Sequence, residues 1–117
     1  TTSATKRLKI RRATGVAVTN TANSFIDADF AMPSTASAGA LAPLGKVTHV
    51  TGTTSITSIT TTNLKAGDEL TLIFDGVLTV TDGNNLKLAG NFVTTADDVL
   101  KLHYDGTNFY ELSRSVN

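Results

Sequence analysis

Five aspartates in the second half of this 117-residue chain are the side chains best suited to acid–base chemistry: Asp75, Asp82, Asp97, Asp98 and Asp105. Glycoside hydrolysis needs two carboxyl groups flanking the scissile bond, and adjacent Asp97 and Asp98 offer such a pair. Asp75, Asp82 and Asp105 are each followed by glycine, however, and Asp-Gly is typical of tight turns because both residues tolerate a positive φ. The sequence therefore favours turns over catalysis, and we predict that the protein is not an enzyme.

Metal and cofactor sites have weaker support. The segment Asp82-Gly-Asn84-Asn85 offers oxygen ligands for a hard cation such as calcium, but it lacks the alternating acids of a calcium loop. His49 and His103 are far apart in the sequence, with no Ser or Cys nucleophile beside either, and His103 shares its strand parity with Lys101, so it should face solvent or a subunit seam. No glycine-rich phosphate-binding motif is present. We predict no metal and no cofactor.

The elements that must position these residues come from a repeated pattern. Alternating apolar residues followed by a turn occur at 70–76, 78–83, 86–91 and 100–106. Leu70, Leu78 and Leu86 recur every eight residues, which suits a short strand and a turn but not a parallel β-helix coil of roughly twenty residues. The sequence predicts an all-β, antiparallel β-sandwich or jelly roll.

The apolar positions of these strands give the predicted core. Its members are Leu70, Leu72, Phe74, Leu78, Val80, Leu86, Leu88, Leu100, Leu102, Tyr104, Phe109 and Leu112. Further strands are predicted at 16–18 and 24–30, and the segment 34–43 is predicted to be either a loop or an interdigitating segment at a subunit boundary. The segment 46–62 repeats Thr-Ser-Ile with period three, which indicates a bulge or a corner between sheets.

Composition limits the possible partners. Thr is the most frequent residue, charged residues make up 17%, and the formal net charge is zero. A neutral chain gives no reason to expect binding to nucleic acid or to an anionic membrane surface, and no apolar run is long enough to insert into a membrane. We predict one domain over 15–117, preceded by a basic arm over 1–14.

The basic arm has two interpretations. Its charges are Lys6, Arg7, Lys9, Arg11 and Arg12, and no acidic residue precedes Asp27. Because Leu8 and Ile10 alternate with charges, the arm can be an edge strand that resists edge-to-edge association. Alternatively, it can attach the protein to an acidic neighbour. Nucleic acid fits less well because no aromatic residue is interleaved with the charges.

One aromatic residue is a candidate for contact with another molecule. Phe109 and Tyr110 are neighbours on a predicted strand and must face opposite ways. If Phe109 lies in the core, Tyr110 is exposed and can touch either a glycan or the next subunit.

Three segments together resemble a known family. Gly67-Asp-Glu-Leu-Thr-Leu-Ile-Phe-Asp-Gly, Asn85-Leu-Lys-Leu-Ala-Gly-Asn-Phe and Tyr104-Asp-Gly-Thr-Asn-Phe-Tyr-Glu-Leu-Ser-Arg-Ser are similar to the C-terminal domain of bacteriophage tail spikes and related virion proteins. The resemblance covers about residues 46–117. It implies a homotrimeric β-sandwich that caps or projects from a virion component. The catalytic β-helix that usually precedes this domain is not in this sequence, so the resemblance does not extend to depolymerase activity.

Two functions follow as expectations. The first is a phage virion structural protein, a homotrimer that decorates or caps a capsid or tail component and contacts other virion proteins. The alternative is a receptor-binding module that recognises host surface polysaccharide. In both cases the expected location is the virion.

Overall fold

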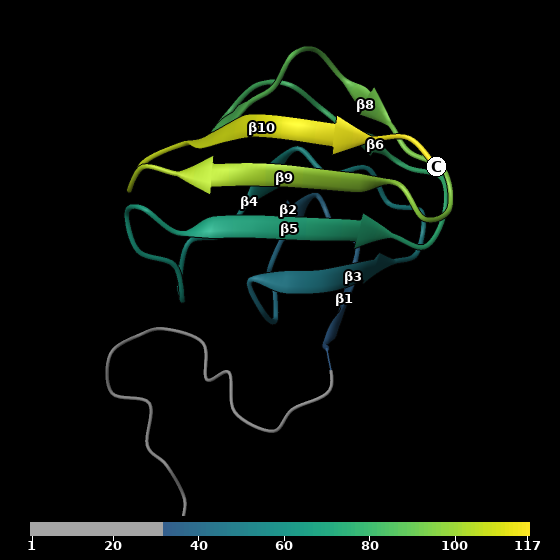
Figure 1. Ribbon diagram of the computed structural model, residues 1–117, viewed down its shortest axis with the longest axis horizontal. Coiled ribbons are helices and arrows are strands. Elements are labelled where there is room, and N and C mark those ends of the chain that lie inside the picture. Colours follow the sequence, from purple (N-terminus) through teal and green to yellow (C-terminus); the bar gives the residue numbers. More distant parts are fainter. Residues whose placement is uncertain (1–31) are drawn as a thin grey trace, which may run out of the picture.

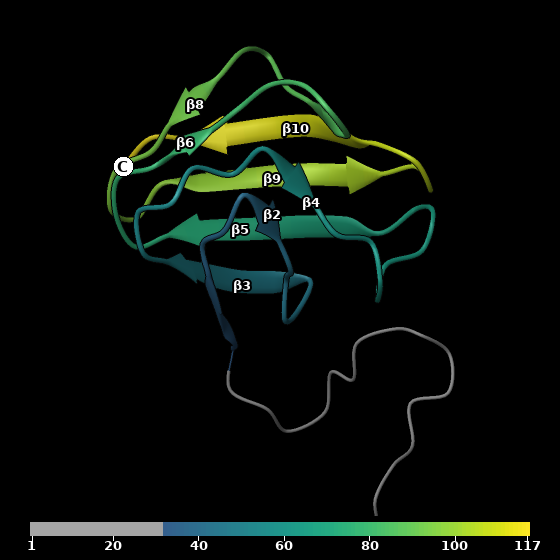
Figure 2. The same cartoon turned by 180° about the vertical axis from the view of Figure 1, so that it is seen from behind.

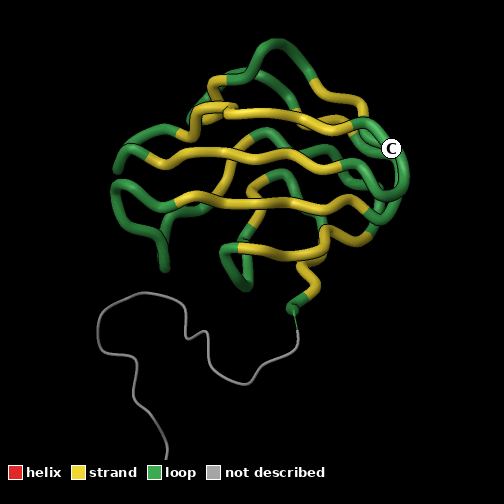
Figure 3. Tube along the Cα trace, in the orientation of Figure 1, coloured by secondary structure: helices red, strands yellow, loops and turns green. Residues whose placement is uncertain are grey.

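The computed structural model describes residues 32–117, and every regular element in this range is a β-strand (Figures 1 and 3). No helix in this range is long and apolar enough to cross a membrane. The all-β prediction is thus confirmed for these residues, whereas the basic arm and the strands predicted at 16–18 and 24–30 lie outside them. The strands are β1 (Ser34–Ala36), β2 (Ala40–Leu41), β3 (Val47–Thr51), β4 (Ser58–Ile59), β5 (Glu69–Phe74), β6 (Thr79–Val80), β7 (Leu86–Lys87), β8 (Phe92–Val93), β9 (Val99–Tyr104) and β10 (Phe109–Ser115).

The strands form one large sheet and two small ones. The large sheet has the order β1-β3-β5-β9-β10-β7, and the small sheets β2-β4 and β6-β8 lie across one of its faces (Figure 2). In the large sheet β1-β3, β3-β5 and β7-β10 are parallel, whereas β5-β9 and β9-β10 are antiparallel. The prediction of antiparallel pairing is therefore wrong, because the sheet is mixed.

Parallel pairing arises because the chain coils. From β1 to β6 successive strands alternate between the large sheet and the small sheets. Thr35 lies opposite Val50, and Val50 lies opposite Phe74, so successive coils take about 15 and 24 residues, close to the period of a parallel coil. The eight-residue spacing of the leucines suggested antiparallel neighbours, but successive leucines lie in different layers. Leu70 belongs to β5 in the large sheet, whereas Leu78 adjoins β6 across the core.

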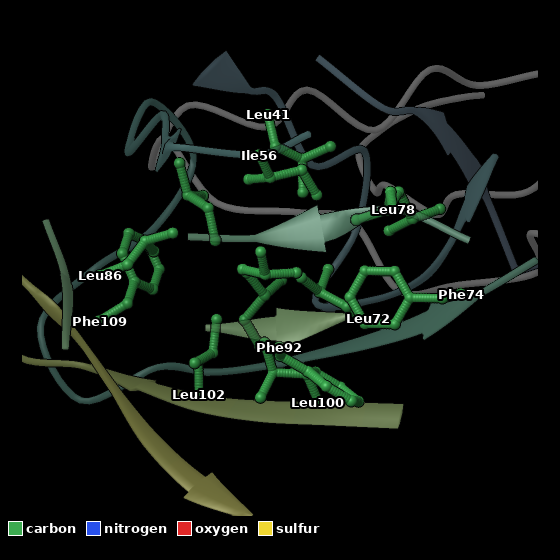
Figure 4. Close-up of a cluster of buried hydrophobic side chains, with 14 of the residues drawn as sticks. Leu41, Ile56, Leu72, Phe74, Leu78, Leu86, Phe92, Leu100, Leu102 and Phe109 are labelled. Carbon is green, nitrogen blue, oxygen red and sulfur yellow. The ribbon is translucent and has the colours of Figure 1, made fainter. Parts of the chain in front are cut away.

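The core lies between the layers (Figure 4). Ten of the twelve predicted core residues are buried; Leu88 is only partly buried against the core, and Leu112 is 53% exposed. Phe74 packs edge-to-face on Phe92 with ring centroids 5.9 Å apart, a favourable geometry for aromatic rings. Six further residues are buried although they were not predicted to belong to the core: Leu41, Val50, Ile56, Ile59, Leu64 and Phe92.

A β-bulge explains the error at Leu112. In the pairing of β10 with β9, Glu111 lies opposite Leu102 and Ser113 lies opposite Lys101, so Leu112 is an extra residue without a partner. A bulge breaks the two-residue alternation on which the prediction depended. Beyond the bulge, Arg114 lies opposite the buried Leu100, and its guanidinium covers the ring of Phe92 at 4.5 Å.

We expect Leu112→Ser to change the free energy of unfolding by less than about 0.5 kcal/mol, because the Leu112 side chain is 53% exposed and has no partner across the β9-β10 pairing. Urea unfolding of the full chain measures this. The matched change Leu102→Ser, at a residue with no exposed surface, should lower the unfolding midpoint strongly. Similar losses at both positions would show that Leu112 belongs to the core.

The predicted Asp-Gly turns are of two kinds. Asp105 and Gly106 do form the β9-β10 hairpin, in which the Asp105 carboxylate accepts the backbone N–H groups of Thr107 and Asn108, and Gly106 has φ +99°. Asp75 and Gly76 instead follow β5 where the chain leaves the large sheet. Gly76 does not have a positive φ, so the prediction of a tight Asp-Gly turn with a positive-φ glycine is wrong at this position.

Candidate functional site

The side of the large sheet that faces away from the small sheets is the broadest surface formed by regular structure, and we call it the outer face. Strand alternation builds it: in β5 and β9 every second residue is buried, and the residues between them point outward. The outer face consists of Val47, His49, Glu69, Thr71, Ile73, Lys87, Val99, Lys101, His103 and Tyr110.

The middle of the outer face is weakly polar. Strand pairing aligns Val47 with Thr71, and His49 with Ile73 and then Val99. Val47 is 44% exposed, while Thr71, Ile73 and Val99 are partly exposed. These short β-branched side chains have little conformational entropy to lose, so burying them against another protein costs little.

One end of the outer face is polar. Glu69 lies opposite His103, and Tyr110 lies between His103 and Lys87. Tyr110 is 43% exposed and His103 is exposed, which confirms both predicted orientations. Lys101 Nζ lies 3.0 Å from Glu69 Oε2, but both side chains are about half exposed, so the pair contributes little to stability.

A second polar contact joins His49 to Asp75. His49 Nδ1 lies 2.6 Å from Asp75 Oδ1, although 26 residues separate them. This contact could not be predicted from the sequence, because the distance between the two side chains depends on the register of β3 against β5. Ser34 lies opposite His49 in β1, but among the residues of the described range no hydrogen bond joins the two side chains. The geometry therefore gives an oriented imidazole without an activated nucleophile.

Asp97 and Asp98 do not form the geometry of a glycosidase pair. Asp98 is fully buried, and it accepts hydrogen bonds from the backbone N–H groups of Asn117 and Thr95 and from the Thr95 hydroxyl, all within 3.0 Å. These bonds, the one from Asn117 foremost, lower the pKa of the Asp98 carboxyl. A general acid needs a raised pKa. Asp98 instead ties the C-terminal residues to the β8-β9 turn.

Stability should fall in acid. The pKa of Asp98 is lowered chiefly by the Asn117 N–H, that of Asp105 by the Asn108 N–H, and that of Glu111 by Arg114. Because the folded-state pKa values lie below those of the unfolded chain, these carboxylates stabilise the fold at neutral pH and lose that contribution as pH falls below about 4. Urea midpoints at pH 7 and pH 3 should differ, and Asp98→Asn should narrow the difference. An unchanged difference in the variant would contradict the role of Asp98.

The polar side chains of segment 82–85, for which no calcium site is predicted, bond to the protein's own backbone. Asp82 Oδ1 accepts the N–H of Leu88, and Asn84 Nδ2 donates to the Thr57 carbonyl. The Asn85 amide bonds the backbone of Ile59 twice: Oδ1 accepts its N–H at 3.2 Å and Nδ2 donates to its carbonyl at 2.7 Å. Residues 32–117 contain no group of three or more His, Cys, Asp or Glu side chains placed to hold a metal.

Glu111 and Arg114 of β10 form an ion pair that was not predicted from the sequence. Arg114 donates to both carboxylate oxygens of Glu111 at 2.7 Å and to the Gly90 carbonyl at 3.0 Å. Glu111 also accepts the N–H of Ala89 at 2.9 Å. The mutual contact lowers the pKa of Glu111 and raises that of Arg114. This pair fixes the loop before β8, so we assign it to structure.

Of the residues predicted to contact other molecules, one lies in the part of the chain that the structure describes. Lys6, Arg7, Lys9, Arg11 and Arg12 lie outside the described residues, whereas Tyr110 lies on the outer face. Comparison of the chain with protein-family models, with curated proteins and with solved structures gave no match.

Proposed function

We propose that this protein is a structural component of a phage virion, a homotrimer that decorates or caps a capsid or tail component and assembles through subunit contacts. The similarity of residues 46–117 to tail-spike C-terminal domains supports this function. The packing of one large sheet against two small sheets is consistent with the sandwich that the resemblance implies, with mixed rather than antiparallel strands.

The outer face is the observation that carries the proposal. Its middle presents Val47, Thr71, Ile73 and Val99 on one regular, six-stranded sheet. Identical copies can bury these β-branched side chains with little loss of side-chain entropy, and the charge of Lys101, which lies opposite Thr71, is paired with Glu69. A 12.2 kDa domain has a small core of its own, so subunit contact would add a large share of its stability.

The basic arm supplies the second contact in this proposal. Lys6, Arg7, Lys9, Arg11 and Arg12 would meet an acidic surface on another virion protein. Charges across an interface mainly steer and select partners, so raised salt should weaken attachment without separating the trimer.

Light scattering of the purified chain tests the assembly. We expect a mass of about three times 12.2 kDa. Ile73→Lys should lower the measured mass to that of the monomer at micromolar concentration, because assembly through the outer face would have to bury an unpaired charge in every subunit.

Val93→Lys is the matched control. Val93 is also a β-branched strand residue and is 63% exposed, but it belongs to β8 in the small sheet across the core. The variant should remain trimeric. A folded monomer of the unmodified chain, or a trimer that survives Ile73→Lys, would contradict the proposed seam.

Tyr110 favours a second candidate, the receptor-binding module. Its exposed ring lies between His103 and Lys87, so an aromatic surface is flanked by hydrogen-bonding groups, as sugar recognition requires. Host polysaccharide binding that Tyr110→Ala abolishes without changing the trimer mass would support this candidate.

A further inference from the structure

Among residues 32–117, no strand pairs with the outer edge of β1 or of β2, which we call the open edge. The Pro33 carbonyl accepts from His49 N–H, and Ser37 N–H donates to the Thr51 carbonyl, so alternate peptide groups of this strand face β3. The groups between them, at Ser34 and Ala36, therefore point away from β3. Within residues 32–117, β1 is the last strand of its sheet on this side.

β2 is open on the same side of the coil. The Gly39 carbonyl accepts from Ser58 N–H, and the Leu41 carbonyl accepts from Thr60 N–H. The peptide groups of Ala40 and Ala42 then face away from β4. Leu44, whose N–H donates to Thr35 Oγ1, lies beside this edge and is 61% exposed.

On the side away from β2, the segment around β4 has hydrogen-bond partners for its backbone. Ile56 exchanges backbone hydrogen bonds with Thr79 and Thr81 at 2.9 and 2.8 Å. The Asn85 side chain hydrogen-bonds both the N–H and the carbonyl of Ile59, as a neighbouring strand would otherwise do. Coiled β-structures need such closure at both ends, because an open edge pairs with any available extended chain.

We propose that the open edge of β1 and β2 binds residues 16–30 of this same chain as one further coil. The chain reaches β1 directly from this segment, and it provides 31 residues before Met32. Val16 and Val18 precede Thr35 by about 17 to 19 residues, and Phe25 and Ile26 precede Leu41 by about 15 or 16 residues. These separations fall within the range of about 15 to 24 residues seen between paired strands.

The spacing makes a position-specific assignment. The segment at 16–18 would pair with β1, and the segment at 25–26 would pair with β2. Each apolar pair would then extend the layer to which its partner strand belongs. A second copy of the protein is the competing occupant, because an edge strand can also pair between molecules.

Amide hydrogen exchange of the full chain, followed by NMR, tests this proposal residue by residue. The amides of Ser34, Ala36 and Ala40 should exchange at least about tenfold more slowly than that of Thr53, an exposed loop residue, after correction for intrinsic rates. Val18→Pro should remove the protection at Ser34 and Ala36, and Ile26→Pro should remove it at Ala40, since proline cannot donate a ladder hydrogen bond. Ser3→Pro is the control and should alter none of them.

The amides of β5 and β9 report whether each variant is folded, and their protection should not change. Exchange at Ser34, Ala36 and Ala40 as fast as at Thr53 in the unmodified chain would overturn the proposal, and so would protection that both proline variants retain. Protection that disappears on dilution together with a fall in particle mass would assign the edge to a second copy and also overturn it. Because Ile73→Lys acts on the outer face, failure of the trimer leaves this result unaffected.

Discussion

Gly106→Val should lower the free energy of unfolding by about 3 kcal/mol. Gly106 has φ +99° in the β9-β10 hairpin, a conformation that a β-branched residue adopts only with strain. A Cβ at this position would also lie 3.3 Å from the Ala66 Cβ, so the neighbouring loop would have to move. Urea unfolding followed by circular dichroism measures the loss.

Gly76→Val is the matched control for this change. Gly76 belongs to an Asp-Gly pair of the same sequence type, but its φ is not positive, and the nearest atom to an added Cβ is the Gly52 carbonyl oxygen at 3.9 Å. The control should cost less than about 1 kcal/mol. Equal losses at the two glycines would show that the Asp-Gly sequence, rather than the backbone conformation, sets the cost.

Asn85→Ala should lower the free energy of unfolding by about 2 to 3 kcal/mol, because it removes the partners of two backbone groups at once. The Asn85 amide satisfies both the N–H and the carbonyl of Ile59, a residue that is only 2% exposed. Alanine leaves a buried donor and a buried acceptor without partners. Asn85→Asp keeps the acceptor but sets a carboxylate oxygen against the Ile59 carbonyl oxygen, so it should cost at least as much as Asn85→Ala.

Asn84→Gly is the control for the loop itself. The Asn84 side chain also donates to a backbone carbonyl, that of Thr57, but this contact is exposed and water can replace it. Glycine accepts the φ of +51° found at Asn84 without strain. We expect a loss below about 1 kcal/mol. A larger loss at Asn84 than at Asn85 would refute the role of Asn85 in closing the coil.

The burial of individual strands was predictable from the sequence. In β5 the alternation of Leu70, Leu72 and Phe74 with polar or half-exposed residues is a local property, and it correctly assigned the buried side. The same parity placed His103 and Tyr110 on the surface. Leu112 failed because the bulge beside it is visible only in the pairing of β10 with β9.

Strand pairing was not predictable in the same way. Leu78 is buried as expected, but nothing in its own segment shows that the chain has crossed the core rather than folded back in a hairpin. A connection of similar length can either cross the core or form a hairpin. Which layer a strand joins therefore depends on its contacts with residues distant in the sequence. The contacts His49–Asp75 and Asn85–Ile59, each 26 residues apart in sequence, depend on that same pairing.

The place of β9 in the large sheet has a consequence for the growing polypeptide. β9 separates β5 from β10, so β5 gains its second neighbour only after residues 99–104 have left the ribosome. Until then β5, with Leu70, Leu72 and Phe74, has an exposed edge next to apolar side chains. β9, which is synthesised after β5, thus protects this edge from aggregation.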